Sequence, residues 1–68
     1  MSDEALVLDA ESRRRLRHDL RTPLTIVVGF AEVLASDRAI SDQNRRAYAE
    51  RIADAAAELR SLLDAVLD

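Results

Sequence analysis

The chain has 68 residues, which limits it to one small domain that is too short to bury a large hydrophobic core by itself. It has no cysteine, which excludes disulfides and thiolate metal sites, and its single glycine and single proline argue against a fold of strands and tight turns. Its formal net charge of −3 makes it a poor nucleic-acid binder. A composition rich in alanine, leucine, arginine and glutamate predicts an all-α domain that completes its core by self-association.

Residues 1–10 form an N-terminal tail or the start of the first helix. Ser2 is a candidate helix cap, with acidic residues after it that favour the positive end of a helix. The sequence contains no apolar run of membrane-spanning length and no signal peptide. We therefore expect a cytoplasmic segment without membrane contact, and leave open whether its parent protein is anchored elsewhere.

A first helix is predicted over about residues 11–36. Its apolar side chains recur every three or four residues, as in a helix packed in a bundle: Leu20, Leu24, Val27, Ala31 and Leu34. A second row, spaced by seven, lies beside this stripe: Leu16, Pro23 and Phe30.

Arg13 and Arg17 stand where the apolar stripe should continue toward the N-terminus. Either this end of the bundle is loosely packed, with the arginine stems lying along apolar surface, or the arginines form a docking patch for an acidic partner or a phosphate. The first reading is favoured.

Residues 37–42 predict a turn, in which Ser41 or Asp42 caps the next helix and Ile40 packs against the bundle. A second helix is predicted over about residues 43–67. Its apolar stripe is Tyr48, Ile52, Ala55, Leu59, Leu62 and Val66. Two amphipathic helices joined by a short turn predict an antiparallel hairpin, and two such hairpins would close a four-helix bundle as a homodimer.

The most distinctive stretch surrounds His18, the only histidine in the chain. His18, Thr22, Thr25 and Gly29 follow one another on the helix face opposite the apolar stripe, so we expect His18 to be accessible. Asp19 could accept the Nδ1 proton and leave Nε2 as the nucleophile, or it could be an ordinary solvated acid. Thr22 lies one turn after His18 and could orient a water, or bond to a helix carbonyl instead.

Pro23 interrupts a strong helical pattern. It has no N–H for the carbonyl of Asp19, so a bend just after His18 is expected, at a cost of about 3 kcal/mol. The small residues Thr25 and Gly29 leave a shallow surface on which another protein could dock, although they could also serve helix–helix contact. With neighbours on the helix, the candidate docking set is Thr25, Ile26, Gly29 and Phe30.

The stretch from His18 to Thr25, HDLRTPLT, followed by VGFAEVL over residues 28–34, resembles the H-box of bacterial sensor histidine kinases. Residues 52–68 are similar to the second helix of the same module, and the resemblance spans roughly residues 12–68. It implies a dimerisation and histidine-phosphotransfer domain over residues 11–68. In that family His18 would be the phosphoacceptor, Asp19 its base, and Thr22 a residue that positions water for phosphatase activity.

The resemblance also implies two partners, an ATP-binding catalytic domain and the receiver domain of a response regulator. One glycine cannot make a phosphate-binding loop, so the chain is expected to bind no cofactor or metal, and ATP and Mg²⁺ would be held by the catalytic domain. We favour an excised part of a histidine kinase. The alternatives are an ATP-independent phosphorelay carrier and a dimerisation coiled coil with an incidental histidine.

Overall fold

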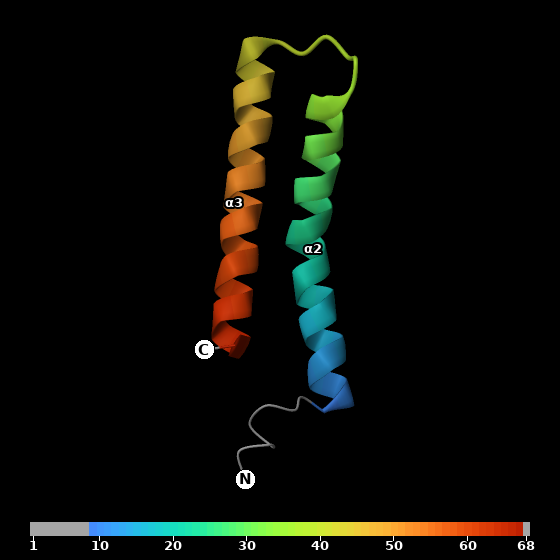
Figure 1. Ribbon diagram of the computed structural model, residues 1–68, viewed down its shortest axis with the longest axis vertical. Coiled ribbons are helices and arrows are strands. Elements are labelled where there is room, and N and C mark those ends of the chain that lie inside the picture. The colour runs from blue at the N-terminus through green and yellow to red at the C-terminus, as the bar shows by residue number, and fades with distance from the viewer. Residues whose placement is uncertain (1–8, 68) are drawn as a thin grey trace.

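The computed structural model describes residues 9–67 and contains two long helices that run antiparallel (Figure 1). Helix α2 spans Ala10–Ala35 and helix α3 spans Asp42–Leu67. Each has 26 residues and is therefore about 40 Å long. The predicted all-α hairpin is confirmed, whereas the candidate cap Ser2 and most of the predicted tail lie outside the described residues. Within 9–67, neither helix has an apolar stretch long enough to cross a membrane.

Short polar side chains define the helix ends. The carboxylate of Asp9 accepts the backbone N–H of Ser12 at 2.7 Å and so caps α2, and this hydrogen bond lowers the pKa of Asp9. The hydroxyl of Ser41 accepts the backbone N–H of Asn44 at 3.1 Å. Of the two candidates in the predicted turn, Ser41 is therefore the cap of α3.

Matched residues at intervals of seven hold the two helices together. The rings of Phe30 and Tyr48 lie 5.1 Å apart between their centroids. Because the helices are antiparallel, counting seven residues back along α2 and seven forward along α3 places Pro23 level with Ala55. Pro23 is less than 2% exposed and Ala55 is 6% exposed. The bulky ring of the proline thus lies opposite the smallest side chain of the α3 stripe.

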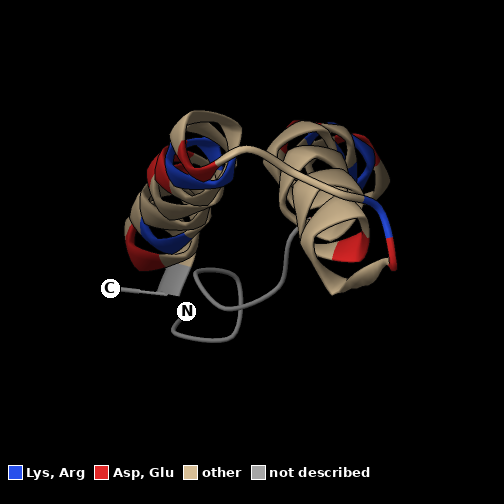
Figure 2. Ribbon diagram, turned by 90° about the horizontal axis from the view of Figure 1, so that it is seen from above, with Lys and Arg blue, Asp and Glu red and all other residues tan. Residues whose placement is uncertain are grey.

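The predicted apolar stripe of α2 is only partly covered. Leu20, Val27 and Leu34 are half-buried, whereas Ala31 is exposed and Leu24 is 49% exposed, which fits the expectation that a second hairpin is needed to close the core. The physical reason is visible in Figure 2, where the two helices form a single layer and each meets one neighbour. The face of α2 toward α3 is instead centred on the seven-residue row that contains Pro23 and Phe30.

Candidate functional site

His18 lies on α2 with its side chain exposed, as the sequence predicts. Thr22, Thr25 and Gly29 are also exposed. Their spacing of four, three and four residues gives one helix face that α3 does not cover. The ring of His18 is therefore open to a partner that approaches α2 from the outside.

The two polar neighbours of His18 differ in how they can reach it. Thr22 lies one turn on, where β-carbons are about 5–6 Å apart on the helix surface. Asp19 is adjacent in sequence, so it projects about 100° around the helix. Among the described residues, neither forms a hydrogen bond with His18. The roles of Asp19 and Thr22 therefore stay predictions, and each requires a side-chain rotation or a bound group.

Pro23 has a packing role that the sequence did not reveal. Helix α2 continues through it, and its ring is buried on the side facing α3. Since proline lacks an amide hydrogen, the carbonyl of Asp19 has no helical donor four residues on. The bend expected here stays a prediction, but Pro23 ties the segment that carries His18 to the hairpin core.

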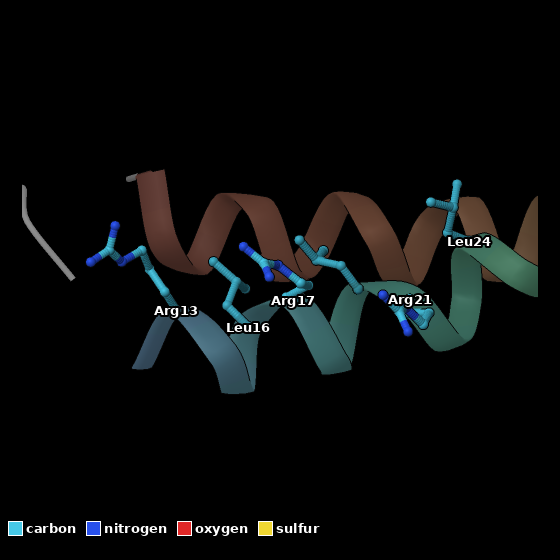
Figure 3. A pocket seen from close by; sticks show the side chains of 6 residues that line it. Arg13, Leu16, Arg17, Arg21 and Leu24 are labelled. Carbon is cyan, nitrogen blue, oxygen red and sulfur yellow. The ribbon is translucent and has the colours of Figure 1, made fainter. Parts of the chain in front are cut away.

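A shallow hollow surrounds His18 and is lined otherwise by arginines alone, Arg14, Arg17 and Arg21. The apolar pattern drew attention to Arg17 but not to Arg14 and Arg21, although these two lie four residues before and three residues after His18 and so share its side of the helix. A neighbouring hollow is lined alternately by arginine and leucine side chains (Figure 3), namely Arg13, Leu16, Arg17, Leu20, Arg21 and Leu24. The N-terminal half of α2 therefore presents a strongly basic surface around the histidine.

A second, apolar hollow lies further along α2. It is lined by the four predicted docking residues together with Val33, namely Thr25, Ile26, Gly29, Phe30 and Val33. A β-carbon built on Gly29 would meet nothing within 4 Å, so no contact within the described chain requires a glycine there. On α3, the guanidinium of Arg51 lies 5.4 Å from the ring centroid of Phe30, a contact that the sequence did not predict.

That another domain holds ATP and Mg²⁺ stays a prediction. Gly29 lies within α2 and its φ is negative, so it belongs to no phosphate-binding loop. The described residues also contain no group of three or more histidine, cysteine or acidic side chains that could hold a metal ion. The site offers a nucleophile, His18, and positive charge from the arginines around it.

Comparison with known proteins agrees with this arrangement. The sequence model for the His Kinase A (phospho-acceptor) domain matches residues 14–68. The chain belongs to this family. His Kinase A domains act as phosphoacceptors, and the matched range includes His18 and both helices.

Two curated relatives of the His Kinase A domain come from bacterial sensor proteins. The chain is 34% identical over 68 residues to sensor protein VanSC of Enterococcus gallinarum, covering 93% of this chain and 19% of the relative. It is 30% identical over 53 residues to sensor histidine kinase YcbM of Bacillus subtilis strain 168, covering 78% of this chain and 17% of the relative. The chain thus spans about a fifth of the length of these relatives. No solved structure gives a significant match.

Proposed function

We propose that His18 is the phosphoacceptor of a two-component sensor histidine kinase and passes its phosphoryl group to an aspartate of a response regulator. The observation that carries this proposal is the exposure of His18 on α2, inside an arginine-lined hollow and on the helix face that leads to an apolar hollow. A separate catalytic domain would bring ATP with Mg²⁺, because the described chain has no residues arranged to hold them. The exchange would take place in the cytoplasm, where ATP and response regulators are found.

The reaction needs a nucleophile held in place and little other covalent chemistry. The lone pair of a ring nitrogen of His18 forms an N–P bond to the γ-phosphorus, while the P–O bond to ADP breaks and its electron pair leaves with ADP. In the second transfer, a carboxylate oxygen of the receiver forms the new bond to phosphorus. The N–P bond then breaks and its electron pair returns to the ring. Asp19 would accept the proton of the other ring nitrogen after a side-chain rotation.

We propose that the domain works as a homodimer. Four large apolar side chains are 40–49% exposed in the single hairpin: Leu24, Val28, Leu63 and Val66. Leu24 and Val28 are one turn apart on α2, and Leu63 and Val66 are one turn apart on α3. Covering both pairs with a second hairpin gives a closed four-helix core, which a chain of this size needs for stability.

The receiver domain would dock on the apolar hollow around Gly29, which follows His18 on the same face of α2. Thr22 lies between the hollow and His18 and is exposed, which supports a second activity in which its hydroxyl positions a water for dephosphorylation of the receiver. This phosphatase activity would be lost in Thr22→Ala, while phosphorylation of His18 would persist.

The main proposal is tested by incubating the chain with an active histidine-kinase catalytic domain, ATP and Mg²⁺. We expect an acid-labile phosphoryl group on the wild-type chain and none on His18→Gln. The matched control is Asn44→Gln, which keeps His18 and changes an exposed side chain near the turn. No label on a folded dimer, with a catalytic domain shown to be active on another substrate, would favour a dimerisation coiled coil.

A further inference from the structure

Within residues 9–67, the three arginines that line the hollow at His18 form no ion pair, whereas three of the chain's other seven arginines do. Arg15 pairs with Glu11 at 3.3 Å, Arg45 with Asp42 at 3.2 Å, and Arg46 with Glu50 at 3.7 Å. Arg51 lies over the ring of Phe30. Within residues 9–67, by contrast, no carboxylate lies within ion-pair distance of the three that line the hollow at His18, which are Arg14, Arg17 and Arg21.

Their positions suit one small anion at His18. Arg14 precedes His18 by one turn and Arg21 follows it by just under one turn, so both project from the same side of α2 as the ring. Arg17 is adjacent in sequence and lines the same hollow. Guanidinium groups on long flexible stems can turn toward a common point, and each can donate two parallel hydrogen bonds to phosphate oxygens.

An unphosphorylated His18 gives these charges nothing to bind. Three cations around a neutral or positive imidazole repel one another and contribute no pairing energy. A phosphoryl group would bring about two negative charges and three acceptor oxygens to the centre of the hollow. The arrangement is therefore complementary to the phosphorylated histidine.

We propose that Arg14, Arg17 and Arg21 form a cationic frame that binds the phosphoryl group on His18. This inference rests on the proposed function, and it adds a binding role for Arg14 and Arg17, which lie outside the H-box. The frame attracts an incoming phosphoryl donor and neutralises the charge that forms on His18. It supplies within this chain part of the charge stabilisation that phosphoryl transfer requires.

The frame can be tested without ATP or a catalytic domain by using phosphoramidate as the donor. The lone pair of a ring nitrogen forms the N–P bond, the P–N bond of the zwitterionic reagent breaks, and its electron pair leaves with ammonia. The rate of labelling of the full chain is compared between wild type and the double variant Arg14→Gln/Arg17→Gln. The matched control, Arg38→Gln/Arg46→Gln, removes the same charge near the turn, and Arg46 contributes only one exposed surface pair.

We expect labelling of His18 to be about fivefold slower in Arg14→Gln/Arg17→Gln and nearly unchanged in the control, since exposed charge pairs contribute about 0.2–1 kcal/mol each. Arg14→Lys/Arg17→Lys should restore most of the rate. The difference should shrink at about 1 M salt, where the screening length falls to about 3 Å. Circular dichroism checks that all variants remain helical.

The outcomes separate the two proposals. Equal rates in the wild type, the glutamine double variant and the control would overturn the cationic frame and leave His18 as the acceptor. Equal slowing in the glutamine double variant and the control would also overturn it, because net charge alone would explain the result. Absence of label on His18 with both phosphoramidate and the ATP-loaded catalytic domain would overturn the proposed function itself.

Discussion

The two ends of the hairpin are built differently. At the turn end, the rings of Phe30 and Tyr48 stack and Arg51 covers the phenylalanine, and Pro23 lies buried seven residues further along. At the open end, where α2 begins and α3 ends, Leu16 is half-buried like Phe30 but stands among exposed arginines. His18 lies at the open end, just beyond the last well-packed layer at Pro23.

The residues that stabilise the hairpin and the residues proposed for the chemistry therefore lie at different ends of it. Packed aromatic and aliphatic side chains at the turn end fix the register of α2 against α3. At the open end Arg15 pairs with Glu11, but the three arginines that line the hollow at His18 form no ion pair within residues 9–67 and are available to a phosphoryl group.

The exposed apolar face should be the most sensitive part of the molecule. Leu24→Asp places a charge where a second hairpin would pack, and we expect the dimer to weaken by about 2–3 kcal/mol, or roughly 100-fold in its dissociation constant. Ala57→Asp, on the charged face of α3, is the control for adding an acid to a helix. Sedimentation equilibrium measures both. An unchanged dimer in Leu24→Asp would show that this face is not the interface.

Truncating one apolar side chain at each end of the hairpin compares how much packing at the two ends contributes to stability. Phe30→Ala removes the stacked ring at the turn end, and we expect it to lower the free energy of unfolding by about 2–3 kcal/mol. Leu16→Ala at the open end should cost only about 1 kcal/mol, since it removes a smaller half-buried side chain that has no aromatic partner. Urea unfolding at one fixed chain concentration gives both values. Equal losses would contradict the difference in packing between the two ends.

Substituting Gly29 should affect stability and partner binding in opposite directions. Gly29→Ala is expected to raise the free energy of unfolding by about 1 kcal/mol, because alanine is the better helix former and the new methyl group meets nothing within 4 Å. The same methyl group would occupy the apolar hollow and slow phosphoryl transfer to a receiver domain. Thermal unfolding and a transfer assay measure the two effects. A variant that is more stable and transfers at the wild-type rate would show that the receiver does not use this hollow.

Substituting Asp9 should lower the stability of the domain by a small amount that depends on pH. Its pKa is lowered below 3.8 because its carboxylate accepts the N–H of Ser12 at the start of α2. The stabilisation is therefore fully present above about pH 3.8 and is lost as the pH falls through the lowered pKa. Asp9→Ala should be less stable than wild type at neutral pH and equally stable once the carboxylate is protonated. Thermal melts across this range test it, and a difference that does not vary with pH would contradict the cap.

The sequence predicted the features that depend on local periodicity. Both helices, a cap at Ser41 or Asp42 and the exposed face that carries His18 follow from spacing and from short-range hydrogen bonding, and the structure selects Ser41 as the cap. It did not predict which of two adjacent apolar rows on α2 meets α3. That choice depends on the register between helices, which is set by the pairing of Phe30 with Tyr48 and by the fit of Pro23 beside a small residue.

The candidate site, like the fold, was predicted only in part from the sequence. The motif pointed to His18, Thr25 and Gly29, which share one exposed helix face, and the docking role of the hollow around Gly29 stays a prediction. The arginine frame was missed because Arg17 was judged as an interruption of an apolar stripe, and the spacing of Arg14 and Arg21 from His18 was not considered. The contact between Arg51 and Phe30 joins two helices, so spacing within either helix could not reveal it.

The most direct test of the central claim is to locate the phosphoryl group itself. The wild-type chain is labelled by an active catalytic domain with ATP and Mg²⁺, kept at alkaline pH to preserve the N–P bond, and sequenced by mass spectrometry. We expect a phosphoryl group on His18 and on no other residue. A phosphoryl group found instead on Thr22 or Ser12 would contradict it, since a hydroxyl and not the imidazole would then be the acceptor.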